Sequence, residues 1–273
     1  MKKLSLIALG LILILVFSAC TGSGQQSSGG SGTADKESKK TLTVVTNAEY
    51  APFEYLDKGE VVGFDIDIIK QMAKEAGYDY KLKNIGWDPL FVEIKNKRAD
   101  LGISSISITD DRKKTYDFSV PYFLSTNEIL VPENSDIKSA ADLKGKTVAV
   151  MAGTTGQTVL EKLLGKNNKK IKKFKQNTLA IMEMIKGGAD AVVADNTVVE
   201  EYAKNNPKQK LKVIKDTKTF EPEYYGLMFP KGSKLKADFD KAINKMYDDG
   251  SYEKIYQKWF KTKPDIETLK SQQ

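Results

Sequence analysis

From residue 42 onward, short apolar runs of strand length alternate with segments whose apolar residues recur at helical spacing. The predicted strands are 42–46, 78–85, a short strand within 99–109, 147–151, 171–174, 191–194, 211–214 and 225–229. The predicted helices are 64–76, 89–95, 157–164, 179–186, 196–204, 237–247 and 252–260. Asp65 is predicted to open the first helix and Asp88 to cap the second. This alternation is typical of α/β proteins with largely parallel sheets.

The alternation restarts twice, which predicts two lobes. It breaks off around Pro121 and Pro132 and resumes beyond them. We expect the chain to cross to a second lobe near 128–131 and to return near 222–226. The predicted lobes are therefore 41–128 together with 224–273, and 129–223. A folded part of roughly 230 residues is long enough to build a large core in two such lobes.

The N-terminus has the pattern of a targeting segment. Two lysines are followed by an apolar stretch at 4–17, which is short for a membrane span, and then by Ser18 and Ala19. The stretch VFSAC, which ends at Cys20, resembles the lipobox of bacterial lipoproteins, although the phenylalanine is less usual there than leucine. We expect 1–19 to be a signal peptide and Cys20 to be acylated, most simply with palmitate-like chains that anchor the protein in a membrane. The alternative is a secreted protein with an incidental cysteine.

Residues 21–40 consist of Gly, Ser, Gln and charged residues, with too little apolar surface to fold. We therefore expect 20–40 to be the lipidated cysteine followed by a flexible linker. The formal charge is +7, and its lysines are spread among acids along the chain, so a solvated basic surface is favoured over nucleic-acid binding.

The chain contains no histidine and one cysteine, Cys20. Disulfides within the chain, Ser-His-Asp or Cys-His catalysis and histidine-ligated metal sites are thereby excluded. No catalytic residue, cofactor or metal is expected, and the pattern favours binding over chemistry.

Several motifs in register resemble one family. They are NAEYAPFEY with GEVVGFDIDI, ADLGISSISITDDRKKTYDFSVPY, LKGKTVAVMAGTTG, GGADAVVADN, and YGLMFPKGS with DGSYEKIYQKWF. Together they cover residues 41–262 and resemble the polar amino-acid-binding proteins of ABC importers, which include the lysine/arginine/ornithine-, histidine- and glutamine-binding proteins. The resemblance implies a two-lobed α/β periplasmic-binding-protein fold of type II with two crossover hinge strands. It also implies three partners, namely a free L-amino acid, the transmembrane subunits of an ABC permease and their ATPase.

The resemblance implies that Arg112 holds the ligand carboxylate, because a guanidinium offers a planar fork of donors. Alternatively, Arg112 pairs with Asp110 or Asp111 on a surface turn. Thr154 and Thr155 are implied to complete the carboxylate site, since free backbone N–H groups at a helix start attract an anion.

For the ammonium group, the resemblance implies Ser105, Ser107 and Asp195. Asp195 follows a predicted buried strand, where α/β sheets bind ligands, although aspartate there is also a common helix cap. Ser104 is included in the site, with a contribution by packing alone as the alternative.

Tyr50 and Trp87 occupy positions at which the family encloses the ligand side chain, and Met151 is counted with them. Phe53 is a further candidate, with a core position as the alternative. A ligand cation would gain about 0.5–2 kcal/mol from the Trp87 ring.

Basic-amino-acid binders often have an aspartate where this chain has Asn47, which also belongs to the predicted site. Glu49 could supply the missing negative charge, unless it is a solvated loop acid, and Glu54 is a weaker candidate. Arginine, lysine or histidine is the favoured ligand, and glutamine is the alternative. A sensing lipoprotein and a prephenate-dehydratase-like enzyme are the other functions considered.

Overall fold

The computed structural model describes residues 40–273. The predicted signal peptide, Cys20 and the linker up to residue 39 lie outside the described residues, so these predictions are not tested. Within 40–273 the strands form two five-stranded sheets, a three-stranded sheet and a two-stranded sheet. The α/β architecture expected from the sequence is confirmed.

The first sheet has the strand order β5 (Asp79–Asn84), β1 (Thr41–Thr46), β6 (Leu101–Gly102), β15 (Met228–Pro230) and β7 (Tyr116–Phe118). The first three strands are parallel, whereas β15 is antiparallel to both of its neighbours. The prediction of a largely parallel sheet is therefore correct for one half of this sheet and wrong for the other. The antiparallel half arises because β15 joins this sheet only after the chain has formed the other five-stranded sheet and returned.

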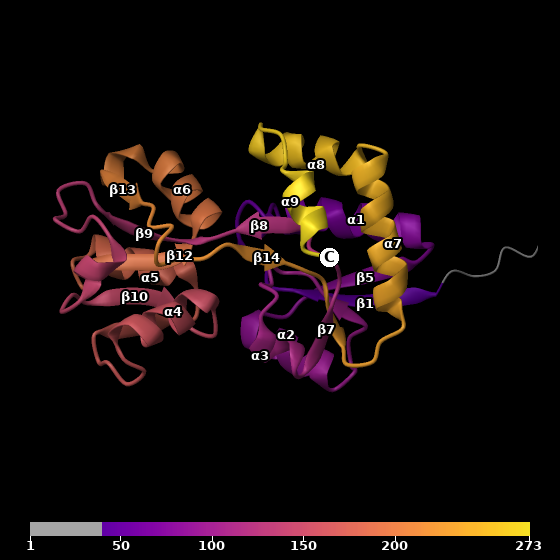
Figure 1. Ribbon diagram of the computed structural model, residues 1–273, viewed down its shortest axis with the longest axis horizontal. Coiled ribbons are helices and arrows are strands. Elements are labelled where there is room, and N and C mark those ends of the chain that lie inside the picture. The colour runs from indigo at the N-terminus through magenta and orange to yellow at the C-terminus, as the bar shows by residue number, and fades with distance from the viewer. Residues whose placement is uncertain (1–39) are drawn as a thin grey trace, which may run out of the picture. The chain divides into compact units, whose positions relative to one another are not determined.

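Helices cover both faces of the first sheet (Figure 1). On one face, α1 (Phe64–Ala76), α7 (Leu235–Asp248) and α8 (Ser251–Phe260) bury apolar side chains in one cluster, with the C-terminal α9 (Ile266–Ser271) beside them. On the other face, α2 (Trp87–Lys95) packs in a second cluster, and α3 (Asp110–Lys113) follows later in the chain.

The helix starts differ from the sequence prediction in two places. Gly86 is the N-cap of α2, and Asp88 lies in the first turn, so the prediction of Asp88 as the cap is wrong. Gly63 precedes α1, and Asp65 is fully buried in its first turn. At Gly63 φ is 143°, and a Cβ atom would lie 1.9 Å from the Phe53 carbonyl oxygen, so only glycine fits there.

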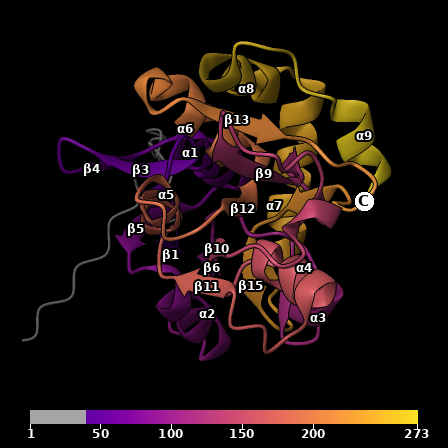
Figure 2. The ribbon, with the colours of Figure 1, turned by 90° about the vertical axis from the view of Figure 1, so that its left-hand side faces the viewer.

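The second sheet has the order β11 (Ile171–Phe174), β10 (Val148–Met151), β12 (Ala191–Asp195), β9 (Asn127–Pro132) and β13 (Leu211–Ile214). The side chains of its central strands alternate between two apolar clusters, so both faces are buried. Figure 2 shows α4 (Thr155–Leu164) on one side and α5 (Asn177–Ile185) and α6 (Asn196–Asn205) on the other. Two 3-10 turns, Ala140–Leu143 and Pro207–Gln209, complete this part.

The chain passes between the two sheets at β8 (Phe123–Ser125) and β14 (Glu223–Tyr225), which pair with each other in antiparallel fashion (Figure 1). The first crossing therefore precedes the predicted range 128–131, because those residues already belong to β9 in the second sheet. The predicted strand 225–229 is two strands, since the chain changes sheets between β14 and β15. The bounds of the two lobes stay a prediction.

A three-stranded antiparallel sheet made of β2 (Glu49–Tyr50), β3 (Glu54–Asp57) and β4 (Glu60–Val62) lies between β1 and α1 in the sequence. These strands are too short to show a period in the sequence and were not predicted. In the part of the chain that the structure describes, no helix is long and apolar enough to cross a membrane.

Candidate functional site

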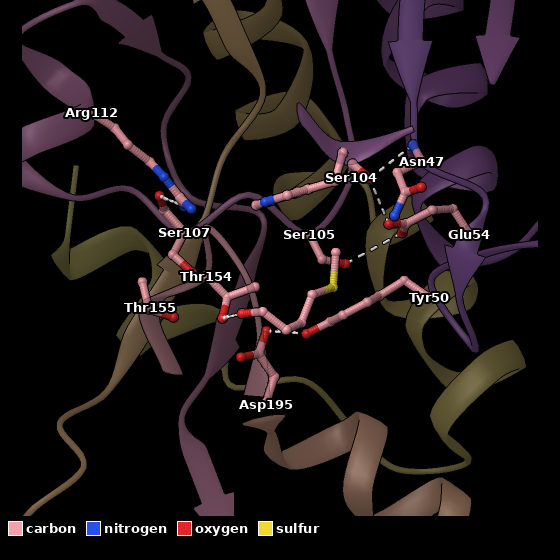
Figure 3. A pocket seen from close by; sticks show the side chains of 12 residues that line it. Asn47, Tyr50, Glu54, Ser104, Ser105, Ser107, Arg112, Thr154, Thr155 and Asp195 are labelled. Carbon is pink, nitrogen blue, oxygen red and sulfur yellow. Dashed lines mark hydrogen bonds between the residues drawn. The ribbon is translucent and has the colours of Figure 1, made fainter. Parts of the chain in front are cut away.

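A small pocket, called the site pocket below, lies where strands of both large sheets end (Figure 3). All the predicted site residues except Glu49 line it, and Glu54 joins them. The lining residues are Asn47, Tyr50, Glu54, Trp87, Ser104, Ser105, Ser107, Arg112, Met151, Thr154, Thr155 and Asp195. The free volume between them is about 20 Å³.

The sheets explain why residues so far apart in the sequence meet here. Asn47 follows β1, Met151 ends β10 and Asp195 ends β12. The carboxyl ends of parallel strands share one edge of a sheet, which is where α/β proteins bind ligands. Each sheet therefore contributes one wall of the site pocket.

Glu49 does not line the pocket. Successive side chains of a strand point to opposite faces, and in β2 Tyr50 is buried while Glu49 is exposed. The prediction that Glu49 lines the pocket as the selectivity acid is therefore corrected: its side chain is exposed outside the pocket. Glu54 is fully buried at the start of β3 and lines the pocket instead. Phe53 belongs to the core, with its ring against those of Phe64 and Phe123.

Arg112 reaches from one wall of the pocket to the other. Its guanidinium donates to the Ser107 carbonyl at 2.8 Å and to the Gly153 carbonyl at 3.2 Å. The group also lies 5.5 Å from the ring centre of Trp87. Burial lowers the pKa of Arg112, and the nearby carboxylates of Glu223 and Asp195 oppose that effect. A half-buried guanidinium of this kind is a strong anion site.

The alternative partners of Arg112 are engaged elsewhere. Asp110 lies 3.8 Å from Lys113 within the short helix α3, and Asp111 lies 3.0 Å from Lys114, the C-cap of that helix. Thr109 caps this helix by accepting a hydrogen bond from the Arg112 backbone N–H at 3.2 Å. The cap fixes the backbone of Arg112 so that the side chain points into the pocket.

Asp195 lies on the opposite wall and is buried. Its carboxylate accepts a hydrogen bond from the Tyr50 hydroxyl at 2.5 Å (Figure 3). It accepts another from the Tyr225 hydroxyl. Asp195 occupies the N-cap position of α6, but its side chain makes no capping bond. Burial raises the pKa of Asp195, and the two tyrosine hydroxyls and Arg112 act against the rise. The side chain therefore faces the pocket and not the helix that follows it.

The start of α4 is built as the sequence suggested. Thr154 is the N-cap: its hydroxyl accepts from the Gln157 N–H at 3.4 Å and donates to the Met151 carbonyl at 2.8 Å. The helix begins at Thr155, two residues before the predicted start, and its first N–H groups have no partner within the helix.

Glu223 was missed by the sequence analysis. It lies on the crossover strand β14, and its Oε2 accepts from the hydroxyls of Ser107 and Thr155, both at 2.7 Å. Its other oxygen accepts from the Asn127 side-chain amide. Burial, followed by the charge of Asp195, raises the pKa of Glu223 to about 7. The sequence offered one indication of this role, namely an acidic residue within the segment 222–226, where the chain was predicted to return to the first lobe.

Glu223 should therefore make stability depend on pH. Its pKa is about 7 in the folded protein and about 4.5 when unfolded, so the folded protein binds more protons between those values. Stability contributed by this proton is present below about pH 4.5 and lost as the pH rises through about 7. We expect Glu223→Gln to melt higher relative to wild type at pH 8 than at pH 4.5, by about 2–4 °C for each kcal/mol regained. Differential scanning calorimetry at both pH values measures this.

Glu221→Gln is the matched control, because Glu221 is exposed and lies two residues away. Its melting difference from wild type should be the same at both pH values. A pH-independent difference for Glu223→Gln as well would contradict the assignment.

Glu54 and Asp65 form a second acidic feature, called the acid pair below. The hydroxyl of Ser104 donates to Glu54 Oε1 at 2.8 Å, and that of Ser105 donates to Oε2 at 3.3 Å. Asp65 Oδ2 accepts from the Ser105 N–H at 2.8 Å and from the Tyr122 hydroxyl at 2.9 Å. Ser104 thus does more than pack, since its hydroxyl also accepts from the Asn47 N–H at 3.1 Å.

Ser105 holds the acid pair together at some conformational cost. Its φ is 49°, a left-handed conformation that non-glycine residues seldom adopt. This conformation lets its N–H face Asp65 while its hydroxyl faces Glu54. Burial, then the neighbouring Asp65, raises the pKa of Glu54 well above its usual value, and burial raises the pKa of Asp65 to about 6.

The fold and the pocket define a two-lobed ligand-binding protein of the type II periplasmic-binding class. The chain belongs to the bacterial extracellular solute-binding proteins, family 3, whose family model matches residues 42–262. Membership of this extracellular family places the protein outside the cytoplasm. In residues 40–273 there is no cluster of three or more side chains able to hold a metal ion.

Among similar proteins, a probable histidine-binding protein of Neisseria gonorrhoeae is 40% identical over 90% of this chain and 91% of its own. The arginine-binding extracellular protein ArtP of Bacillus subtilis is 34% identical over 91% of this chain and 97% of its own. The crystal structure of the arginine-, lysine-, histidine-binding protein ArtJ from Geobacillus stearothermophilus matches with a TM-score of 0.83 and 53% identity. It covers 85% of this chain and all of that one.

Proposed function

We propose that the protein captures a free L-amino acid, with arginine, lysine or histidine preferred, and delivers it to the permease of an ABC importer. The observation that carries the proposal is the convergence of Arg112 and Asp195, of opposite charge, from the two walls of one pocket. An amino-acid zwitterion needs such a pair, with a donor fork for its carboxylate and an acceptor for its ammonium.

The charge of the pocket supports a cationic ligand. Asp195 and Glu54 line it together with one cation, Arg112, and Glu223 contacts Ser107 and Thr155 beside it. Once the zwitterion has satisfied Arg112 and Asp195, Glu54 is left to meet the ligand side chain. The aromatic rings of Trp87 and Tyr50 can enclose an aliphatic stem. The binding named for the three relatives above points the same way.

Glutamine is the alternative ligand. Asn47 lines the pocket and offers an amide that can exchange hydrogen bonds with the ligand's amide. A prephenate-dehydratase-like enzyme is disfavoured, because the chain contains no histidine and the polar groups suit a zwitterion. We place the protein on the outer face of the membrane through an acylated Cys20. A sensing lipoprotein would need the same ligand-binding site. Loss of amino-acid uptake when the gene is deleted would indicate transport, and unchanged uptake would indicate sensing.

Closure of the pocket gives the mechanism. Arg112 and Asp195 enter the pocket from the sides of different sheets, so a ligand that binds between them requires the two walls to separate for entry. The crossover strands β8 and β14 are the segments about which they would move. A ligand that touches Arg112 on one wall and Asp195 on the other favours the closed form, because only that form makes both contacts.

A thermal-shift screen of the twenty amino acids tests the proposed function. The protein should first be unfolded and refolded, since copies purified from cells can carry ligand. A ligand at 100 times its Kd stabilises the protein by about 2.7 kcal/mol, which is a shift of several degrees. We expect the largest shifts from arginine, lysine or histidine, and a flat response to all twenty would contradict the proposal.

A further inference from the structure

The acid pair adjoins the site pocket through Glu54, which lines it, and carries two carboxyl groups in one buried place. Glu54 and Asp65 are both fully buried, and Ser105 bonds to both of them. The donors that reach the pair are all neutral, namely the hydroxyls of Ser104, Ser105 and Tyr122 and one backbone N–H. Two negative charges held together away from water without a cation are strongly unfavourable.

The titratable groups around the pair do not supply a positive charge. Tyr50 of β2, Tyr122 before β8 and Tyr252 of α8 face it, and burial raises the pKa of each well above its usual value, which keeps all three neutral. Asp195 lies beyond Tyr50, to which it is hydrogen-bonded. The pocket's cation, Arg112, bonds instead to the carbonyls of Ser107 and Gly153.

One oxygen of the pair also lacks a donor. Asp65 Oδ1 is buried and has no hydrogen-bond partner among the described residues. Buried acceptors are normally satisfied, and a proton on the adjacent Glu54 would satisfy this one. Two buried carboxyl groups bridged by Ser105, one of them with an unsatisfied oxygen, are arranged to share one proton, which then belongs to the pair and not to either residue.

We infer that the acid pair exchanges its proton for the cationic side chain of the ligand. This inference rests on the proposed function, because it assumes that an amino acid binds in the site pocket. When a guanidinium or ammonium group reaches Glu54, it supplies the positive charge that the pair lacks, and the proton leaves to the solvent. A neutral side chain supplies no charge, so the proton stays. The pair thus allows one pocket to accept both kinds of ligand and ties the preference between them to pH.

The direction of the pH effect follows from the released proton. Below the apparent pKa of the pair in the free protein, arginine affinity should rise by up to tenfold for each pH unit and then level off. Arginine is the suitable probe, because its own guanidinium does not titrate in this range. Any effect of Glu223 should act on the end of the ligand common to all amino acids, so it cancels in the ratio of arginine to glutamine affinity.

Titration calorimetry of the refolded protein at pH 6, in two buffers of different ionisation enthalpy, counts the protons released. We expect close to one proton more for each arginine bound than for each glutamine bound. Glu54→Gln should release the same number of protons with either ligand, and it should weaken the binding of arginine at least tenfold more than that of glutamine. Glu49→Gln is the matched control, since it removes the same charge five residues away on an exposed face, and it should behave as wild type.

Asp65→Asn provides a second variant in case Glu54→Gln is poorly folded. The amide can accept from Ser105 and Tyr122 through its oxygen and donate to Glu54 through its nitrogen, in the place of the shared proton. This variant should release no more protons with arginine than with glutamine, and the ratio of arginine to glutamine affinity should not rise with pH. Equal proton counts for arginine and glutamine in the wild type, or a difference that survives in both variants, would overturn the inference while leaving the proposed function intact. If no amino acid binds, the proposed function fails, and the inference fails with it.

Discussion

Replacing Arg112 by alanine is expected to abolish measurable binding of every amino acid, whatever its side chain. The guanidinium is the cation of the site pocket and would make two charge-assisted hydrogen bonds to the ligand carboxylate. Losing such bonds costs about 3–4 kcal/mol, which is a drop in affinity of roughly 10²–10³-fold. Titration calorimetry with arginine and glutamine measures both losses.

Arg98→Ala is the control for this change. Arg98 is exposed and bonds to Glu93 on the surface, so its loss should leave binding unchanged. Arg112→Lys separates charge from geometry, because lysine keeps the charge but not the planar fork, and it should recover only part of the affinity. If Arg112→Ala retains tight binding, the ligand carboxylate is held elsewhere and the orientation proposed here is wrong.

Asp195→Asn is expected to weaken the binding of every amino acid by roughly 10–100-fold. Asparagine keeps the shape of the side chain and an oxygen that can accept from Tyr50 and Tyr225, but it removes the full negative charge opposite the ligand ammonium. The loss of a charged hydrogen bond in a buried site is worth about 1.5–3 kcal/mol. The same calorimetric titration, with arginine and glutamine side by side, gives the ratio of variant to wild-type Kd for each ligand.

Asp190→Asn serves as the control at the other end of β12, where the side chain accepts from the Thr147 N–H on the surface. Because every amino acid carries the ammonium group, the loss caused by Asp195→Asn should be similar for arginine and glutamine. A loss confined to arginine would instead assign Asp195 to the ligand side chain, against the proposal.

The sequence predicted the elements of the α/β alternation well, because the strong helical periods mark out the strands between the helices. The helix at 64–76 and the strands at 171–174 and 211–214 have the predicted bounds. The short strands β2 to β4 lie outside this alternation and were missed, and β14 and β15 were merged into one predicted strand, because such short runs have no period of their own and no helix between them. Strand direction also depends on contacts between distant segments. The antiparallel position of β15 could not be predicted from local pattern.

Most of the pocket lining was predicted through the family resemblance, and the exceptions have a local cause. Glu49 and Glu54 lie on the short strands β2 and β3, and the face on which each side chain lies follows from a register that the sequence did not give. Glu223 was missed because its role depends on donors from both sheets, Ser107 and Thr155. The role of Asp65 was likewise hidden, because an aspartate at a helix start ordinarily indicates a cap.

The central claim is that one amino acid binds between Arg112 and Asp195 and that a cationic side chain is preferred. Titration calorimetry of the refolded wild-type protein at pH 8, with arginine and glutamine in parallel, tests it most directly. The account predicts one arginine bound to each protein with a Kd in the micromolar range or below, and weaker binding of glutamine. Glutamine binding tighter than arginine would contradict the preference, and no binding of either ligand would contradict the account as a whole.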